Sequence, residues 1–407
     1  MEKRLSVKSL TWLFALIYFA SYVTRINFSA IVQEIVTATG YEKSLLSTVL
    51  VCLSVTYGVG QIINGWIGDR VKPQNLILCG LIIATIINIL LPFFVFSIPV
   101  MCALWAINGF AQAMMWPPIV KILVGCANEE EYGYAVVRIS WGSSIGTIFV
   151  YLCSPFIIKF FTWEVVFAVS AVIGLVATIV WASLKKYTFV TLPKDEKGEF
   201  LVPAPAKFPK EAVFPIVFIV LAIIFQGMLR DGITSWMPTY LSEVFGLGNS
   251  ESILSTVVMA VFSMISFSIA GWLYKRFFKI EVACGVVMFA VVIVFAVALF
   301  LLFDFGAVIA LLFATIIIGA IHGVNLMLIT HVPKRFRRYG NISTISGLIN
   351  SCTYIGAATF TYGAAAIAEN SGWQATVGVW AIIAILGTAS CLIAMKPWKK
   401  FMEMKEE

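Results

Sequence analysis

An arginine lies in the middle of the first long apolar run, and the residues around it have the types and spacing of an anion-binding site. Tyr18, Tyr22, Arg25 and Ser29 share one helical face, at spacings of i, i+4, i+7 and i+11. Burying a guanidinium near the bilayer centre costs roughly 2.5 to 3.5 kcal/mol, so such a residue normally faces a bundle interior or a water-filled cavity. The pattern predicts one wall of a site for an anion.

A second arginine stands at the corresponding place in the second half of the chain. An offset of 205 residues carries Arg25 onto Arg230, and we expect both to converge on one central cavity. A guanidinium fork matches the oxygens of phosphate or carboxylate better than an ammonium does. The alternative is a structural ion pair between Arg230 and Asp231. Consecutive helix residues point about 100° apart, which allows Asp231 to face a neighbouring helix instead, so we favour the ligand interpretation.

The composition excludes a soluble globular domain. Of 407 residues, 60% are apolar and 12% are charged, and the mean hydropathy is +0.96. Runs of about 20 apolar residues recur, as in a polytopic α-helical membrane protein. The net charge of +7 comes from basic residues that flank these runs, which favours positive-inside topology over nucleic-acid binding. The eight cysteines form no Cys-x-x-Cys pair, so we expect neither a disulfide framework nor a metal site.

Twelve membrane spans are predicted, at about 10–33, 44–68, 75–97, 99–125, 132–158, 163–184, 213–240, 251–274, 281–303, 306–331, 341–368 and 373–395. Basic residues gather in both termini and after the even-numbered spans, whereas the opposite loops hold only Lys43 and Lys159. Both termini are therefore expected to be cytoplasmic. The acidic run at residues 129–131 departs from this pattern, but acidic residues carry little weight in the rule.

The chain divides into two similar halves. A polar segment with four prolines follows the sixth span, so we predict a six-helix half at 1–184, a cytoplasmic linker at 185–212 and a second six-helix half at 213–407. Gly65-Trp-Ile-Gly-Asp-Arg70 after the second span corresponds to Gly271-Trp-Leu-Tyr-Lys-Arg276 after the eighth. Parallel repeats with a site at their interface are the plan of many secondary transporters.

Several other predicted helices carry polar residues on one face. These are Tyr57, Gln61 and Asn64; Asn108, Gln112 and Trp116; Ser140, Ser144, Thr147 and Tyr151; and Asn350, Tyr354 and Thr361. Such stripes line a cavity or form hydrogen bonds between helices. We favour the cavity for Tyr57 and Trp116, and hydrogen bonding for the helix at 132–158.

Three further residues have alternative interpretations. His322 is expected to be a neutral histidine of the helix core, although it could also carry a proton or contact a phosphate. Arg138 is expected to form an ion pair with Asp69 or with the nearby glutamates rather than to contact a substrate. The chain has no phosphate-binding loop of the Gly-x-x-x-x-Gly-Lys-Ser/Thr type, so ATP hydrolysis by this chain is not expected.

The motifs resemble those of the major facilitator superfamily. The segment 65–72, Gly-Trp-Ile-Gly-Asp-Arg-Val-Lys, is similar to its helix 2–3 loop signature, with a lysine where the family often has glycine. Within it the chain resembles the organophosphate:phosphate antiporters from the first span to the last. The resemblance is carried by Tyr22-Val-Thr-Arg-Ile-Asn-Phe28, Asn108-Gly-Phe-Ala-Gln-Ala-Met-Met-Trp-Pro-Pro118 and Leu229-Arg-Asp-Gly-Ile-Thr-Ser-Trp-Met-Pro-Thr-Tyr240.

The resemblance implies roles for individual residues. In the glycerol-phosphate exchanger of that family, the positions matching Arg25 and Arg230 bind phosphate, and those matching Tyr18, Tyr22, Tyr57 and Trp116 line the cavity. That exchanger has a lysine where Gln61 stands and a histidine where Ser143 is aligned. These departures, together with Asp231, reduce the cationic character of the site, so the substrate is expected to carry less charge than glycerol phosphate or to be bulkier.

The sequence predicts an inner-membrane antiporter for a phosphorylated metabolite, working by rocking of two six-helix halves without cofactor, metal or enzymatic activity. Its expected partners are a small anionic metabolite, the lipid bilayer, and inorganic phosphate or protons, and it is expected to act as a monomer. The substrate-binding candidates are Arg25, Arg230, Tyr18, Tyr22, Tyr57, Gln61, Trp116, Ser143, His322 and Tyr354, and the gating candidates are Asp69, Arg70 and Arg138. A proton-coupled carboxylate carrier and a membrane sensor of sugar phosphate remain alternatives.

Overall fold

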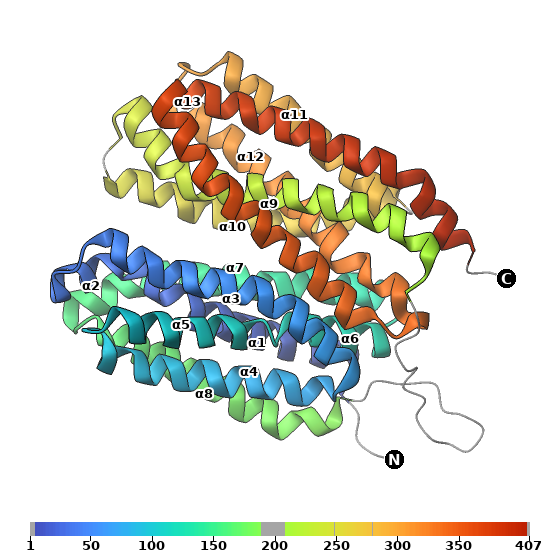
Figure 1. Cartoon of the computed structure of the whole chain (residues 1–407), viewed down its shortest axis with the longest axis horizontal. Helices are drawn as coiled ribbons and strands as arrows, with labels where there is room; N and C mark the ends of the chain where they lie inside the picture. Colours follow the sequence, from blue (N-terminus) through green and yellow to red (C-terminus); the bar gives the residue numbers. More distant parts are fainter. Residues whose placement is uncertain (1–4, 189–207, 248, 279, 405–407) are drawn as a thin grey trace. The chain divides into compact units, whose positions relative to one another are not determined.

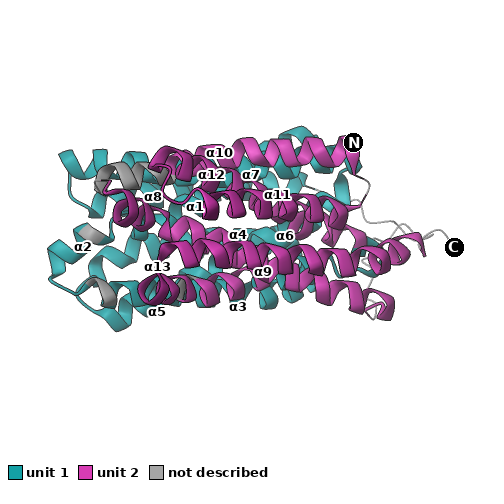
Figure 2. Cartoon of the chain, turned by 90° about the horizontal axis from the view of Figure 1, so that it is seen from above, with its two compact units in different colours: residues 1–206, 336–351 teal, residues 207–335, 352–407 magenta. Residues whose placement is uncertain are grey.

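The computed structural model describes residues 5–188, 208–247, 249–278 and 280–404. The regular structure in these ranges is helical throughout, as predicted (Figure 1). The helices gather into two compact units, Met1–Ala206 with Phe336–Ser351 and Lys207–Arg335 with Cys352–Glu407 (Figure 2). Most of the predicted linker, residues 189–207, lies outside the described residues, and the predicted boundaries of the two halves stay a prediction.

The first unit is built mainly from the N-terminal helices. They are α1 (Val7–Ala30), α2 (Val32–Thr39), α3 (Lys43–Arg70), α4 (Pro73–Leu90), η1 (Leu91–Phe94), α5 (Ile98–Gln112), α6 (Trp116–Cys126), α7 (Glu129–Phe160), α8 (Glu164–Leu184) and η2 (Lys185–Tyr187). Asn128 and Glu131 start α7 with a reciprocal capping box, which satisfies two otherwise unpaired backbone N–H groups.

The second unit contains α9 (Lys210–Phe245), α10 (Asn249–Phe277), α11 (Glu281–Leu301), α12 (Ala307–Asn325) and a six-residue π-helix, η3 (Leu326–His331). A 3₁₀ segment, η4 (Pro333–Tyr339), leads to α13 (Ile342–Glu403). The predicted span 306–331 is thus α-helical only in its first part. The structure provides no physical reason for the π-turn, whose six side chains are all buried.

The described helices account for twelve membrane spans. Eleven are long and apolar enough to cross a bilayer. The twelfth follows from α13, whose 62 residues would extend about 90 Å, three times the thickness of a hydrocarbon core. Gly372, with φ 81° and ψ 168°, interrupts α13, so its two parts cross separately. The predicted fold class, an all-α membrane protein with twelve spans, is confirmed.

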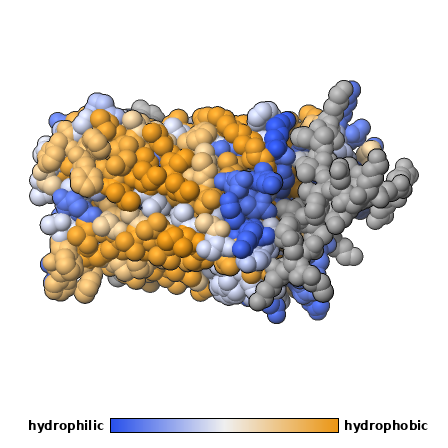
Figure 3. All heavy atoms as spheres, turned by 90° about the horizontal axis from the view of Figure 1, so that it is seen from below, coloured by the Kyte–Doolittle hydropathy of each residue, from blue (hydrophilic) through white to orange (hydrophobic). Residues whose placement is uncertain are grey.

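Exposed apolar side chains mark the faces that contact lipid. On α3, Val51, Val55, Val59, Ile62 and Trp66 are exposed and follow one helical face. On the face seen in Figure 3, apolar side chains cover most of the surface and hydrophilic ones gather toward one end. A large exposed apolar surface is unfavourable in water and is what a bilayer requires.

Two prolines interrupt the fourth predicted span. Helix α5 ends at Gln112 and α6 begins at Trp116, directly before Pro117 and Pro118. Proline has no backbone N–H, and its ring clashes with the preceding turn, so the regular α-helical ladder cannot continue through this point. The interruption sets Trp116 at the start of a new helix.

Candidate anion site and gating contacts

Aromatic rings of two helices surround Arg25 in the first unit. Its guanidinium carbon lies 4.2 Å from the ring centroid of Tyr22 and 4.9 Å from that of Tyr57. Tyr18 extends the cluster, because its ring lies 5.3 Å from Tyr22 and 5.1 Å from Trp116. Rings at these distances attract a cation through their quadrupole. The structure therefore brings together five of the predicted substrate-binding residues of this unit, Tyr18, Tyr22, Arg25, Tyr57 and Trp116.

A polar network behind Arg25 fixes the rotation of α1. Ser21 donates to the Gln112 carboxamide oxygen at 2.5 Å, and the Gln112 amide nitrogen donates to the Thr24 hydroxyl at 2.9 Å. Asn108 and Asn88 both donate to the Thr24 carbonyl, at 3.0 and 2.9 Å. Asn108 and Gln112 thus hold helices together, the alternative that the sequence left open for polar stripes. Ser21 directly precedes Tyr22 and Thr24 directly precedes Arg25 in the chain. The network therefore positions both of these site residues.

Gln61 is fully buried one helical turn after Tyr57 on α3. Neither its amide nitrogen nor its amide oxygen has a hydrogen-bond partner among the described residues. A buried amide without partners costs about 1 to 3 kcal/mol, so a ligand or water that pairs with Gln61 would gain this energy. The predicted assignment of Gln61 to the substrate site is consistent with this geometry and stays a prediction.

Ser143 is used inside its own helix. Its hydroxyl donates to the Ser140 carbonyl at 2.7 Å, and Thr147 donates in turn to the Ser143 carbonyl at 3.0 Å. Bonds of this kind are common for hydroxyls in membrane helices. The hydroxyls of Ser140, Ser143 and Thr147 therefore bond within α7, whereas the sequence favoured hydrogen bonds between helices. Tyr151 does bond between helices, to Ser29 of α1. A role for Ser143 in substrate binding stays a prediction.

Arg230 forms a bidentate ion pair with Asp231 in the second unit. Its Nε donates to one carboxylate oxygen at 2.5 Å and a terminal nitrogen donates to the other at 3.0 Å. The ion pair that the sequence left open as an alternative is therefore present, because both side chains are long enough to bend toward each other across the 100° that separates them. The Tyr354 ring lies 5.6 Å from the guanidinium carbon. The fork of Arg230 has the geometry that binds carboxylates and phosphates.

Two other polar residues lie close to this pair. His322 of α12 packs its ring 5.1 Å from that of Phe267 and interacts electrostatically with both Arg230 and Asp231. Gln226, one turn before Arg230, is fully buried, and both its amide atoms lack partners among the described residues. Sequence reasoning missed Gln226. Its signal was a lone amide in an apolar run, four residues before the arginine on the same helical face.

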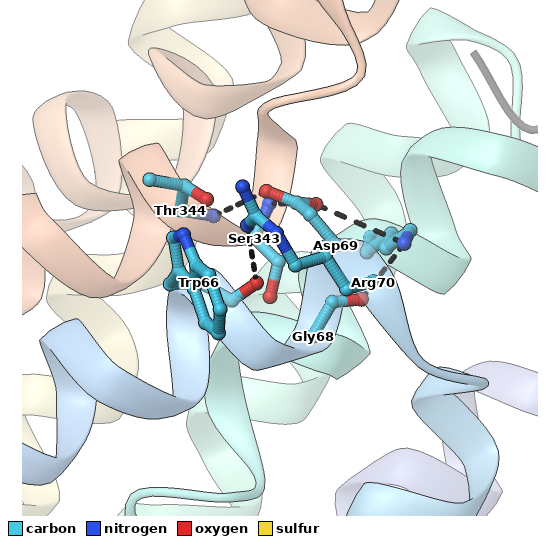
Figure 4. Close-up of polar contacts among 7 residues, drawn as sticks. Trp66, Gly68, Asp69, Arg70, Ser343 and Thr344 are labelled. Atoms are coloured by element: carbon cyan, nitrogen blue, oxygen red, sulfur yellow. Dashed lines mark hydrogen bonds and ion pairs between the residues drawn. The ribbon is translucent and has the colours of Figure 1, made fainter. Parts of the chain in front are cut away.

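Asp69, at the end of α3, caps the start of α13 (Figure 4). Its carboxylate oxygens accept hydrogen bonds from the backbone N–H groups of Ser343, at 3.0 Å, and Thr344, at 2.8 Å. Lys121 of α6 donates to the Gly68 carbonyl at 2.7 Å and lies 3.8 Å from Asp69. We call this arrangement of Asp69 with the two amides the Asp69 cap. A carboxylate at a helix N-terminus is stabilised by unpaired N–H groups and by the helix dipole.

The other two gating candidates make different contacts. Arg138 does not pair with Asp69 or with the glutamates, contrary to expectation; its guanidinium lies 4.1 Å from the Tyr134 ring and 4.9 Å from the Trp141 ring. These rings are its neighbours at i−4 and i+3 on α7, within reach along the same face of the helix. Arg70 donates to the Trp66 carbonyl at 2.9 Å and stacks on its ring. Lys121, which the sequence analysis missed, takes the place expected for Arg138.

Comparisons with known proteins define the class. A family model of the Major Facilitator Superfamily matches residues 14–361, so the chain belongs to this superfamily of membrane transporters and is not an enzyme. The solved proton:xylose symporter XylE has the same fold, with a TM-score of 0.75 at 13% identity over 96% of this chain and 95% of that one.

Proteins similar in sequence to this chain indicate a family within the superfamily. The chain is 28% identical to the glycerol-3-phosphate transporter of Bacillus subtilis over 368 residues, 84% of this chain and 82% of that protein. It is 23% identical to a probable hexose phosphate transport protein of Chlamydia muridarum, over 88% and 84% of the two chains. The membrane sensor protein UhpC of Salmonella typhimurium is 22% identical over 94% and 89%. These relatives bear out the resemblance to the organophosphate:phosphate antiporter family.

Proposed function

We propose that the chain is a secondary active transporter of a phosphorylated organic anion, of the sugar phosphate or glycerol phosphate type. The observation that carries the proposal is the pair of arginines at equivalent positions of membrane-spanning helices. The Arg25 guanidinium lies against the rings of Tyr22 and Tyr57. The Arg230 guanidinium binds the Asp231 carboxylate through two hydrogen bonds. The names of the glycerol-phosphate and hexose-phosphate relatives support this substrate class.

The proposed mechanism is alternating access about one anion site to which both arginines contribute. Each guanidinium offers two parallel N–H donors to the oxygens of a phosphate. The buried amides of Gln61 and Gln226, which lack protein partners among the described residues, are suited to bind the hydroxyls of the organic part. Exchange with inorganic phosphate follows from the same chemistry, because phosphate presents the same oxygens. We place the protein in the inner membrane with both termini in the cytoplasm.

A carboxylate substrate coupled to protons is the second candidate. The observation in its favour is that a carboxylate, that of Asp231, already binds the fork of Arg230 in bidentate fashion. A sensor of sugar phosphate is a third candidate, supported by the similarity to UhpC along most of the chain. A neighbouring histidine-kinase gene would favour the sensor, and a neighbouring gene for a sugar-phosphate enzyme would favour the transporter.

Binding measurements on purified protein test the anion site. We expect thermal stabilisation by glycerol 3-phosphate or glucose 6-phosphate, and weaker or no stabilisation by organic acids. Arg25→Lys and Arg230→Lys keep the charge but lose the bidentate fork, so each should weaken binding by about tenfold or more, the equivalent of 1.4 kcal/mol. Arg276→Lys is the matched control, because Arg276 is exposed in the last turn of α10. Near-normal binding in both lysine variants would refute the shared anion site.

Transport assays separate the remaining candidates. Reconstituted vesicles loaded with inorganic phosphate should accumulate external glycerol 3-phosphate or glucose 6-phosphate by exchange. Uptake of a carboxylate driven by a proton gradient, without exchange of phosphate, would favour the second candidate. Tight binding of sugar phosphate without any transport would favour the sensor.

A further inference from the structure

The fork of Arg230 is already occupied by an anionic group of the chain itself. Asp231 accepts hydrogen bonds from Nε at 2.5 Å and from a terminal nitrogen at 3.0 Å. An incoming phosphate or carboxylate that binds through Nε and the same terminal nitrogen needs these two donors. Because each N–H group makes one strong bond at a time, such an anion and Asp231 compete for this side of the guanidinium.

The pair is open to exchange. The side chain of Arg230 is 17% exposed and that of Asp231 is 32% exposed, although both lie within the membrane-spanning helix α9. Exposure of charged groups to hydrocarbon is strongly unfavourable, so the exposed part of the pair faces water. Water on this side gives an anion a route to the guanidinium, and gives a proton a route to the carboxylate.

We propose that Asp231 is an internal competitor that couples anion binding to proton uptake. The incoming anion takes the two guanidinium donors, the Asp231 carboxylate is displaced, and the carboxylate then takes up one proton from water. On release of the anion the proton leaves and the pair forms again. The inference rests on the proposed anion site at Arg230 and adds to it the residue that makes binding conditional on pH.

The coupling follows from the charges. While the pair is intact, Asp231 neutralises Arg230. Once an anion has replaced it, Asp231 lies beside a second negative charge within a membrane helix, and both like-charge repulsion and desolvation favour its neutral form. By linkage, protonation of Asp231 must strengthen anion binding by the same factor as the anion strengthens protonation. Anion affinity should therefore rise as the pH falls.

Other titratable groups near the pair are few in the described part of the second unit. His322 of α12 interacts with both members, and Tyr354 of α13 faces Arg230. Helix α10 carries Lys275 and Arg276 in its last turn, and His331 lies in η3. His322 is thus the group that competes most directly with Asp231 as the proton acceptor, and the test must separate the two.

Calorimetric titration of the full-length protein with glycerol 3-phosphate tests the proposal. Titrations at about pH 7.5 in two buffers of different ionisation enthalpy report protons taken up per anion, and a phosphate ester with a second pKa of about 6 contributes little at this pH. Wild-type protein should take up a fraction of a proton on binding, and its affinity should rise as the pH is lowered. Asp231→Asn keeps the shape without the charge, so it should bind roughly tenfold more tightly and take up no proton, because a charge-assisted bidentate competitor has become a neutral one.

Two matched variants complete the experiment. Asp304→Asn removes the same charge from an exposed position of the second unit and should behave like wild type. His322→Gln, whatever its affinity for the anion, should keep the proton uptake per anion bound. Loss of uptake in His322→Gln with retention in Asp231→Asn would overturn the proposal, as would binding by wild type without any proton uptake. If neither wild type nor Asp231→Asn binds glycerol 3-phosphate, glucose 6-phosphate or inorganic phosphate, it is the proposed anion site that fails.

Discussion

Replacing Asp69 by asparagine should open the Asp69 cap and slow transport while leaving substrate affinity nearly unchanged. The substitution keeps the size of the side chain but turns one acceptor oxygen into a donor. One of the backbone N–H groups of Ser343 and Thr344, which now bond at 3.0 and 2.8 Å, then loses its partner. The site is buried, since the Asp69 side chain has no exposed surface.

The magnitude follows from these contacts. A buried N–H group left without an acceptor costs about 1 to 3 kcal/mol, and loss of a negative charge at a partly buried helix N-terminus adds up to about 2 kcal/mol. The cap should therefore weaken by about 1 to 5 kcal/mol. If the transport cycle requires the cap to form and open, the balance between the two states shifts by roughly fivefold to several thousand-fold, at 1.4 kcal/mol per factor of ten.

Hydrogen–deuterium exchange of the peptide containing residues 343 and 344 measures directly how often the Asp69 cap opens. In Asp69→Asn these two amides should exchange at least about fivefold faster, while exchange in α5 and α8 stays unchanged. Arg70→Gln is the control, because Arg70 is exposed and contacts Trp66 rather than the cap. Unchanged exchange at 343 and 344 would refute the reasoning. A large loss of substrate affinity with normal turnover would place Asp69 in the binding site instead.

Two further predictions concern stability and topology. Glu281 is fully buried and accepts hydrogen bonds from Arg335, Tyr274 and Trp398, the first of them within an ion pair. Glu281→Ala should cost about 3 to 5 kcal/mol, because it removes the carboxylate that neutralises the partly buried Arg335. Thermal unfolding in detergent measures this against Lys399→Ala, which removes an exposed ion pair and should cost less than about 1 kcal/mol; equal effects would contradict the burial argument. A cysteine introduced at the exposed Arg337, after replacement of the exposed Cys79 by serine, should resist an impermeant thiol reagent added to intact cells. Rapid labelling from outside would reverse the predicted topology.

Much of the fold could be predicted from the sequence, because hydropathy and length nearly determine where a membrane helix lies. The rings around Arg25 could also be predicted, since helical periodicity fixes which residues share a face. The single span predicted at 99–125 overlooked the break before Pro117, although the two prolines are the physical signal for it. The π-turn of η3 leaves no such signal in the residue types.

The contacts of the charged residues were harder to predict. Helical periodicity predicts which face of a helix a residue lies on. It does not predict the conformation of a long side chain, which can reach a residue on another face. Arg138 therefore stacks on rings of its own helix, and Arg230 reaches the adjacent Asp231. The hydrogen-bond donors to Asp69 are backbone amides. The residue types in a sequence do not indicate which backbone N–H groups lack a partner within their own helix. Gln226 was missed because a single amide four residues before an arginine is a weak pattern in an apolar run.

The Asp69 cap has a consequence for the pattern of amino-acid substitutions expected among related proteins. Its acceptor is a side chain, but its donors are the backbone N–H groups of residues 343 and 344, which every amino acid except proline provides. Nearby, Gly65 and Gly347 lie so close to opposing backbone that a Cβ atom at either would collide with it. Selection on this contact therefore acts on single positions, one carboxylate and two glycines. Methods that infer contacts from correlated substitutions should find little signal between residues 69 and 343, although a hydrogen bond joins the two residues directly.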